Sequence, residues 1–235
     1  MIYRILYFMS TSTSTSFPSP ETPIYIYFHI CCINNWRTVV DNLFEAICKS
    51  GLYDKVTEIR CGVLGQNIGE DLSHPIFKQA KVKIMYHSTD VLAFERPTLA
   101  RLYEHAYSSC DDFSVLYLHS KGVRHNGQNP CVEDWVNYLI HFNVMLFRDC
   151  LLNLNHCDVV SVNLQHEPST HFSGNFWWSN SEYIKKLNPM IEPSYNGPEF
   201  WITQAQDGQF HSMYNSHVNH YHERFEPCKY KHGNV

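Results

Sequence analysis

The sequence lacks the patterns that mark several large classes of protein. Charged residues make up only 17% of it and the formal net charge is −5, so no overall basic field would attract nucleic acid. The apolar start, residues 1–9, is too short to span a membrane. Hydrophobic residues still reach 44%, which is enough to build a core and argues against general disorder. We therefore expect a folded protein with neither a nucleic-acid partner nor a membrane span.

Zinc motifs and disulfide frameworks are missing as well. The nine cysteines are an odd number, and no two of them form a Cys-x-x-Cys pair. Several lie inside apolar runs, such as Cys31, Cys32 and Cys61. The chain also has no Asn-x-Ser/Thr sequon. Free thiols in a reducing compartment are the simplest interpretation, so we expect a cytoplasmic protein.

The length of 235 residues favours one domain. Residues 10–23 are rich in Ser, Thr and Pro without periodicity, which predicts a flexible tail. The apolar start before them has no small-residue cleavage site, so we do not interpret it as a signal peptide. The expected organisation is a tail over residues 1–23 and one folded domain over residues 24–235.

Strand and helix patterns alternate along this domain. Apolar, β-rich runs predict strands over residues 24–30, 56–64, 82–87, 114–118 and 157–162. Helical spacing of apolar residues predicts helices over residues 36–49, 94–108, 132–154 and 180–187. This alternation predicts an α/β fold with a mainly parallel sheet that is covered by helices on both faces.

Ligands bind beyond the carboxyl ends of the strands in open α/β sheets. His29 is near the carboxyl end of the first predicted strand, and the segment His119-Ser120-Lys121-Gly122 directly follows the fourth, which otherwise reads as fully buried. Lys121 is a compact cation beside a glycine that lets backbone approach closely, which suits a diphosphate. The alternative is a surface lysine in a turn.

A second cluster alternates small, polar and aromatic residues. Gly174 lies between two polar residues and is followed by three aromatic ones, which predicts a sharp turn with an aromatic wall that could stack on a sugar. Alternatively, these aromatic rings anchor the next helix in the core. We assign sugar or acceptor binding to Ser173, Gly174, Asn175, Phe176 and Trp177.

Glu199 is flanked by bulky apolar residues in the third cluster, Gly197 to Trp201. A carboxylate in such a place can take a proton from an acceptor hydroxyl, which makes Glu199 the candidate catalytic base. It can equally open the helix that starts there, where the helix dipole favours an acid. The C-terminal histidines have no metal-binding spacing, and we expect them to be on the surface or packed against aromatic rings.

The order of these clusters resembles a known group of enzymes. The set YLHSKG, a long helix with DW, a DVV strand, HFSGNFWW and PEFW is similar to uncharacterised GT-A-like glycosyltransferases of bacterial polysaccharide loci and giant-virus-like genomes. The resemblance covers roughly Ile24 to Tyr221. It implies a single GT-A-type, Rossmann-like domain that moves a hexose or deoxyhexose from a nucleotide-sugar donor to a glycan or other hydroxyl acceptor.

The resemblance also implies positions for the donor. The helix start at Glu95, Arg96 and Thr98 matches donor-contacting positions. Enzymes of the GT-A type commonly end the fourth strand with an Asp-x-Asp that holds Mn²⁺ or Mg²⁺ against the diphosphate. This chain has His119-Ser120-Lys121 there, and we hypothesise that Lys121, with His119, replaces the metal as the counter-charge. The residues expected to bind the donor are His29, Glu95, Arg96, Thr98, His119, Ser120, Lys121 and Gly122.

The same comparison places Glu199 about where inverting members have their base, so we expect a single displacement with inversion. Three other functions stay open, of which a His-rich metal protein, suggested by the C-terminal histidines, is one. A nucleotidyltransferase usually needs acidic metal ligands and a Gly-rich, basic loop near the first strand, and the segment after Phe28 has neither. A binding domain for carbohydrate or nucleotide-sugar that has lost catalysis is compatible with the missing Asp-x-Asp.

Overall fold

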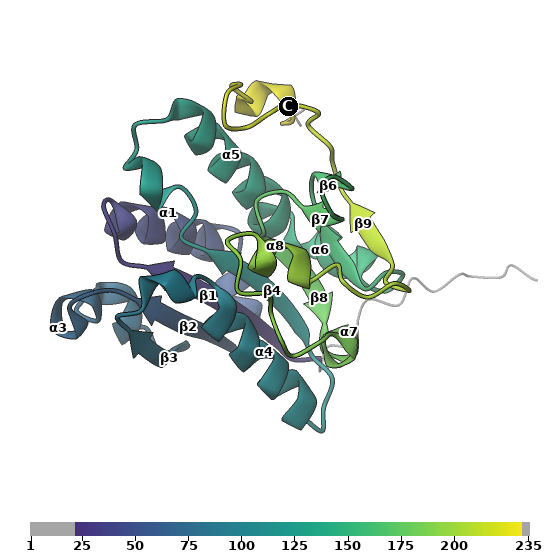
Figure 1. Cartoon of the computed structure of the whole chain (residues 1–235), viewed down its shortest axis with the longest axis horizontal. Coiled ribbons are helices and arrows are strands. Elements are labelled where there is room, and N and C mark those ends of the chain that lie inside the picture. The colour runs from purple at the N-terminus through teal and green to yellow at the C-terminus, as the bar shows by residue number, and fades with distance from the viewer. Residues whose placement is uncertain (1–21, 232–235) are drawn as a thin grey trace, which may run out of the picture.

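A seven-stranded sheet forms the centre of the protein (Figure 1). The structure is a computed structural model, and it describes residues 22–231. The strand order is β3-β2-β1-β4-β8-β5-β9. These strands are β1 (Ile24–Cys31), β2 (Glu58–Leu64), β3 (Val82–Ser88), β4 (Ser114–His119), β5 (Val159–Ser161), β8 (Trp177–Asn180) and β9 (Phe210–Ser212). A separate antiparallel pair consists of β6 (Leu164–Gln165) and β7 (His171–Phe172).

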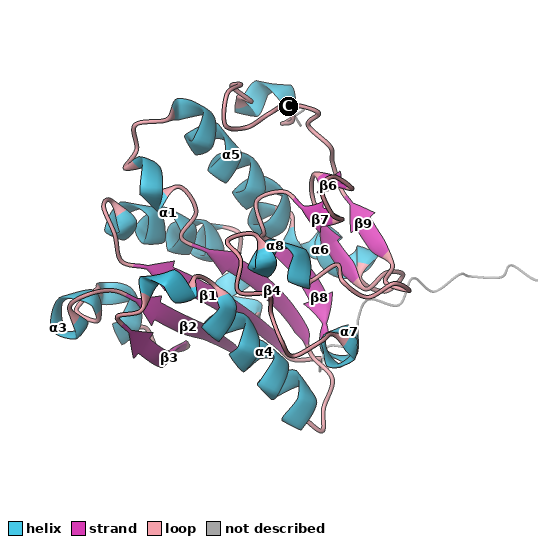
Figure 2. Ribbon diagram, viewed as in Figure 1, coloured by secondary structure: helices cyan, strands magenta, loops and turns pink. Residues whose placement is uncertain are grey.

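Helices flank this sheet, as Figure 2 shows. They are α1 (Trp36–Lys49), α2 (Leu52–Lys55), α3 (Ile68–Asp71), α4 (Arg96–Ser108), α5 (Pro130–Ile140), α6 (Phe147–Asn153), α7 (Ser181–Lys186) and α8 (Gly197–Trp201). Short 3₁₀ turns lie at Pro75–Lys78, Val91–Ala93, Val123–His125 and Pro227–Lys229. The predicted α/β fold with a mostly parallel, helix-covered sheet is confirmed.

Two cores pack against the two faces of the sheet because successive side chains of a strand point in opposite directions. Ile26 and Phe28 of β1 belong to one core, with the buried residues of α1 and α5. Tyr27 belongs to the other, with those of α4 and α7. The central strands are therefore buried on both sides, as their continuous apolar runs predict.

The predicted helix over residues 132–154 is wrong as a single helix. It divides into α5, a π-type turn at His141–Met145, and α6. The buried Asn143 explains the break. Its side-chain Nδ2 donates to the backbone carbonyl of Leu139 at 3.0 Å. Its backbone carbonyl accepts the indole N–H of Trp178 at 2.8 Å. Side chains that bond to helix carbonyls in this way interrupt the regular ladder.

The sheet also contains an insertion that the alternation of elements did not predict. Strands β1 to β4 are parallel, but β8 lies antiparallel between β4 and β5. The first four strands have the order β3-β2-β1-β4. Strands β2 and β3 are therefore added on one side of β1, and β4 is added on the other side. The resulting switch point between β1 and β4 is where ligands of open α/β sheets bind.

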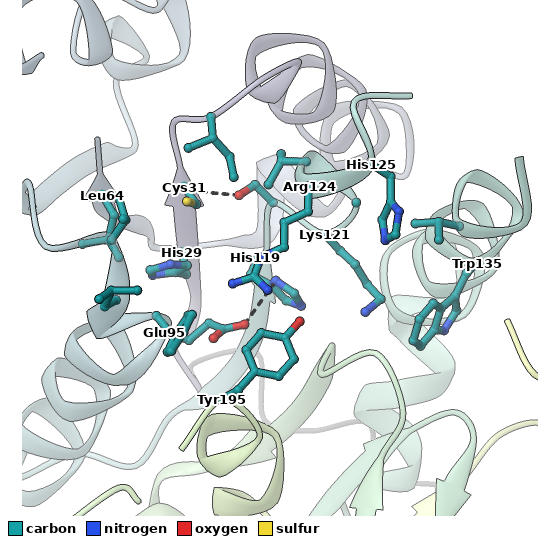
Figure 3. A pocket seen from close by; sticks show the side chains of 18 of the residues that line it. His29, Cys31, Leu64, Glu95, His119, Lys121, Arg124, His125, Trp135 and Tyr195 are labelled. Carbon is teal, nitrogen blue, oxygen red and sulfur yellow. Dashed lines mark hydrogen bonds and ion pairs between the residues drawn. The ribbon is translucent and has the colours of Figure 1, made fainter. Parts of the chain in front are cut away.

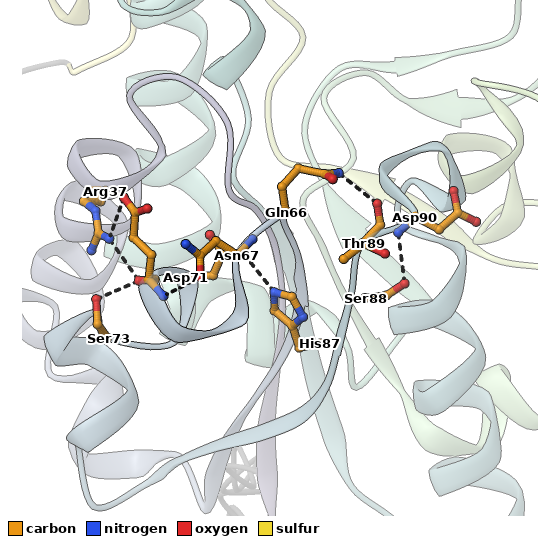
Figure 4. A network of polar contacts seen from close by, with 10 residues as sticks. Arg37, Gln66, Asn67, Asp71, Ser73, His87, Ser88, Thr89 and Asp90 are labelled. Carbon is orange, nitrogen blue, oxygen red and sulfur yellow. Dashed lines mark hydrogen bonds and ion pairs between the residues drawn. The ribbon is translucent and has the colours of Figure 1, made fainter.

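A polar network closes the neighbouring edge of the sheet, beside α3 (Figure 4). Nε2 of His87 lies 2.8 Å from Oδ2 of Asp71, and both side chains are almost fully buried. The same oxygen accepts the backbone N–H of Asn67 at 3.1 Å. Gly65 makes room for this carboxylate, because a Cβ at that position would lie 2.1 Å from Oδ2. The network fixes the ends of β2 and β3 and leaves the ends of β1 and β4 accessible.

Within residues 22–231, no helix is both long enough and apolar enough to cross a lipid bilayer. The predicted tail of residues 1–23 falls almost entirely outside the described part of the chain, and so do residues 232–235.

Candidate active site

A cleft of about 200 Å³ opens at the carboxyl ends of β1 and β4 (Figure 3). His29 and His119 are paired positions of these two parallel strands, so the register alone brings them side by side. The turn after β4 is held against β1 by Ser120, whose Oγ accepts the backbone N–H of Cys31 at 2.9 Å and whose own N–H donates to the carbonyl of His29 at 2.9 Å. The predicted donor residues on the cleft wall are His29, Glu95, His119, Ser120, Lys121 and Gly122.

His29 is buried, and a neighbouring hydroxyl fixes the orientation of its ring. Its ring is 3% exposed, and burial lowers its pKa to about 3. Nδ1 lies 2.8 Å from the hydroxyl of Thr98, which in turn lies 2.6 Å from the hydroxyl of Tyr86. Thr98 is fully buried and is not part of the cleft wall. The structure thus gives Thr98 the task of orienting His29 in place of the predicted donor contact.

His119 joins the two predicted clusters. Its Nε2–H donates to the carbonyl of Gly174 at 3.1 Å, because a carbonyl can only accept. Nδ1 of the neutral ring therefore carries the lone pair, and it lies 3.4 Å from Oε1 of Glu95. Burial lowers the pKa of His119 well below its usual value and raises the pKa of Glu95. Each shift favours the uncharged form of the group concerned, which argues against the predicted part of His119 in the counter-charge.

Lys121 extends into the cleft toward Trp135 (Figure 3). Its ammonium lies 3.6 Å from the centroid of the indole ring, a cation–π contact. Burial lowers the pKa of Lys121, and the charges of Glu199 and then Glu95 act in the opposite direction. Lys121 therefore lies within electrostatic reach of Glu199, the residue predicted as the base.

The cleft contains a second cation that the sequence interpretation missed. Arg124 lines the same wall, with its guanidinium carbon 4.7 Å from the ring of Tyr195 and 5.6 Å from that of Phe94. The signal was present, since Arg124 follows Lys121 by only three residues in the turn after β4. Phe94 has a φ of 50°, which non-glycine residues seldom adopt.

Arg96 is outside the cleft wall, contrary to its predicted role in donor binding. Its guanidinium donates to the carbonyls of Pro193 and Leu92, at 3.1 and 3.0 Å. These bonds tie together the two loops that carry Tyr195 and Phe94. Arg96 supports the cleft from outside because its position at the start of α4 directs it toward these loops.

Glu199, the predicted base, lies against the turn at Gly174. Oε1 of Glu199 accepts the backbone N–H of Gly174 at 2.8 Å. The turn has the predicted conformation, with a φ of 102° at Gly174 and 54° at Asn175. Glu199 and Ser173 line a second, wider pocket of about 650 Å³. Trp135 and Tyr221 line both this pocket and the cleft, so the two spaces adjoin there.

The predicted aromatic wall is wrong. Phe176 and Trp177 are 0% exposed, so neither ring can stack on a sugar. Trp177 stacks on Tyr117 at 5.0 Å and donates its indole N–H to Asn175 at 2.9 Å. Asn175 is itself 4% exposed. These residues belong to or precede β8, and a strand between two others turns its side chains into both cores, which was the alternative interpretation.

The residues at the end of β4 do not fit a divalent metal. Both nitrogens of His119 face protein groups, Ser120 accepts a backbone N–H, and Lys121 is a cation. Hard cations such as Mg²⁺ prefer carboxylate, carbonyl and water oxygens. Throughout residues 22–231, no group of three or more His, Cys, Asp or Glu is arranged to hold a metal ion.

The C-terminal histidines divide between surface and interior. His220 is 3% exposed and stacks on Trp135, with ring centroids 5.2 Å apart and planes 9° apart. This agrees with the expectation of histidines packed on aromatic rings. Trp135 is thus held between Lys121 on the side of the cleft and His220 on the side of the wider pocket.

A family model matches residues 34–227, which is most of the chain. The chain belongs to the family described as Domain of unknown function (DUF8361). A search of curated proteins finds no match.

Among solved structures, the chain is similar to three proteins at low identity. A proposed nucleotide-diphospho-sugar transferase from Desulfovibrio desulfuricans G20 shares 9% identity, with 83% of this chain and 80% of that chain covered and a TM-score of 0.43. HddC from Yersinia pseudotuberculosis shares 7%, with 83% and 91% covered and a TM-score of 0.43. The 4-diphosphocytidyl-2C-methyl-D-erythritol synthase of Anaerococcus prevotii shares 10%, with 82% and 87% covered and a TM-score of 0.46. At this level of similarity, the three structures do not indicate the chemistry of this DUF8361 member, which depends on its own residues.

Besides Arg124, three aromatic site residues were not predicted from the sequence, and they come from separate segments. Trp135 is on α5, Tyr195 precedes α8, and Tyr221 is near the C-terminal end. An aromatic residue gives no local signal that separates a pocket wall from a core position. Only the folded arrangement could identify these three.

Proposed function

We propose that this protein is a glycosyltransferase that moves a sugar from a nucleotide-sugar donor to a hydroxyl acceptor. One observation carries the proposal: two cations line a cleft at the switch point of the sheet, and a carboxylate lines the pocket that adjoins it. The donor's diphosphate would bind in the cleft, and the acceptor would reach the sugar from the pocket.

Lys121 and Arg124 are the groups that would bind the diphosphate. Arginine can hold two phosphate oxygens at once, and lysine supplies a compact point charge. The cleft is partly closed, which strengthens such attractions relative to water. In this proposal the two side chains neutralise the nucleoside diphosphate as it leaves, and the reaction has no step through a metal ion.

Glu199 would act as the general base. Its Oε1 is held by the N–H of Gly174, which leaves Oε2 to take a proton. The acceptor oxygen would attack the anomeric carbon as the bond from that carbon to the phosphate oxygen breaks. The hydroxyl proton would pass to Glu199, and the nucleoside diphosphate would leave with the electron pair. A single displacement of this kind inverts the anomeric centre, and positioning of the two substrates supplies much of the rate.

The first experiment is a thermal-shift screen with UDP-, GDP-, TDP- and CMP-sugars, with and without Mn²⁺. A ligand that binds only the folded chain raises its apparent stability by mass action. We expect one base to stabilise the protein equally well in both conditions. Transfer from that donor to a panel of glycans is then measured for wild type and for the variants below.

Lys121→Met and Arg124→Met should each weaken binding of the nucleoside diphosphate, because each removes a charged hydrogen bond worth about 1.5–3 kcal/mol. This corresponds to a loss of roughly 10- to 150-fold in affinity. Arg101→Met is the matched control, since that arginine is exposed on α4, away from the cleft.

Glu199→Gln should abolish transfer and leave nucleotide binding near normal. Glu182→Gln, at an exposed position of α7 outside the cleft and the wider pocket, should change neither. Turnover by Glu199→Gln at the wild-type rate would remove the catalytic role. Binding of a nucleotide-sugar by wild type without any turnover would favour a binding domain that has lost catalysis.

A further inference from the structure

The wider pocket differs in charge from the cleft beside it. Its wall includes two carboxylates, Glu167 and Glu199, and among its described lining residues there is neither lysine nor arginine. The cleft, in contrast, has Lys121 and Arg124. Opposite charges attract and like charges repel across a binding surface, so the pocket disfavours an anionic ligand.

The polar groups of this pocket are suited to hydroxyls. His171 donates Nδ1–H to the carbonyl of Ser169 at 2.7 Å, since the carbonyl can only accept. The other ring nitrogen, Nε2, is then left to form a hydrogen bond with a hydroxyl of the ligand. Asn219 uses its side-chain oxygen to accept the N–H of Tyr221 at 3.0 Å, and this leaves the amide NH₂ to donate. The pocket thus offers fixed acceptors and donors together.

His220 is held in the wall of this pocket by protein groups. Its Nε2 lies 3.0 Å from the amide nitrogen of Asn163 and 2.8 Å from the hydroxyl of Ser216. The ring stacks on Trp135 and Tyr138. His220 therefore fixes the shape of the wall, and the polar groups that would meet a ligand come from the other residues.

We propose that the wider pocket binds an uncharged, hydroxyl-rich sugar, and that this sugar is the acceptor; the second part rests on the proposed function. Two aromatic side chains in the wall, Phe200 and Tyr221, supply the apolar surface that the carbon face of a sugar ring contacts. The pocket disfavours sugar phosphates and uronic acids because its lining has carboxylates and neither lysine nor arginine.

Saturation-transfer NMR with the full chain tests this inference. The probes are methyl glycosides of glucose, galactose, mannose and N-acetylglucosamine, compared with glucose 6-phosphate and glucuronate. We expect at least one neutral glycoside to bind, and the two anions to bind on the order of tenfold more weakly or not at all. The experiment contains no nucleotide, so its result is independent of whether the chain transfers sugar.

Asn196 also lines the pocket and supplies a further amide group. Asn196→Ala is the first variant, because this side chain makes no capping bond to α8 and its loss should not affect folding. It should weaken binding of the neutral glycoside roughly two- to tenfold, the value of one hydrogen bond. Asn155→Ala, on the surface after α6, should leave it unchanged. Asn196→Lys should create binding of glucose 6-phosphate.

Binding of glucose 6-phosphate by wild type as tightly as any neutral glycoside would overturn the inference. So would the absence of saturation transfer to all four glycosides, or equal binding by Asn196→Ala and wild type. If a neutral glycoside binds here and no nucleotide-sugar is turned over, the proposed function fails and the sugar site remains.

Discussion

Replacing glycines that have a positive φ separates two costs, backbone strain and lack of space. A Cβ at Gly174 would lie 2.7 Å from Cδ1 of Leu139 and 3.1 Å from the indole nitrogen of Trp135. Both neighbours are buried in α5 and have little room to move. At Gly122 the nearest contact would be 3.3 Å, and at Gly51 it would be 3.8 Å. The values of φ are 102°, 92° and 78°, so strain is common to all three.

Gly51→Ala should cost about 1–2 kcal/mol of unfolding free energy, from left-handed backbone strain alone. Gly122→Ala should cost about the same or slightly more. Gly174→Ala adds overpacking of a buried site, at about 1–3 kcal/mol, for a total of roughly 2–5 kcal/mol. Urea unfolding followed by circular dichroism measures all three. Equal losses in the three variants would refute the assignment of a packing cost to Gly174.

The same variant is informative about the site. Gly174 donates to Glu199 and accepts from His119, so a shift of this turn moves both residues. Combining Gly174→Ala with Leu139→Ala should relieve the clash, and the double-mutant cycle should show a coupling of about 0.5–3 kcal/mol. A cycle without coupling would mean that Leu139 is not the obstacle.

Two further predictions follow from burial. The pKa of His29 is lowered to about 3, so between about pH 6.5 and pH 3 the unfolded chain binds a proton that the folded chain does not. As the pH falls through this window, His29 lowers the free energy of unfolding by up to about 1.4 kcal/mol per pH unit. We therefore expect His29→Asn to reduce the dependence of the urea midpoint on pH. His156→Asn, at an exposed position, should leave that dependence unchanged. Native thiol labelling should separate the cysteines by exposure, and rapid reaction of the buried ones in the folded state would contradict the two-sided core. The exposed thiols are Cys48, Cys110 and Cys228, and the buried ones are Cys61 and Cys150.

Local patterns in the sequence predicted much of the architecture. The predicted strands that became β1 to β5 agree with the structure to within one or two residues at each end. These runs are recognisable because a strand covered on both faces must be apolar throughout. The turn at Gly174 was equally predictable, because few residues other than glycine adopt a φ of 102°.

The candidate site could be predicted only in part. Lys121 and His119 were found because they end a buried strand, and the carboxyl ends of parallel strands meet at one edge. Arg96 and Thr98 were given donor contacts, yet one ties two loops and the other orients His29. Arg96 and Thr98 belong to the same helical turn as Glu95. The sequence of one turn does not show which of its side chains will point into the cleft.

The sequence by itself determined the class of fold and the strand ends where polar residues gather, because both depend on periodicity along a continuous segment. Only the tertiary structure decided that Trp177 is buried, that Arg124 lies beside Tyr195, and that Trp135 lies between Lys121 and His220. The physical reason is that these relations join segments far apart in the chain. The aromatic side chains of β8 are in the core because β8 is inserted antiparallel between β4 and β5. No local sequence pattern encodes that strand pairing.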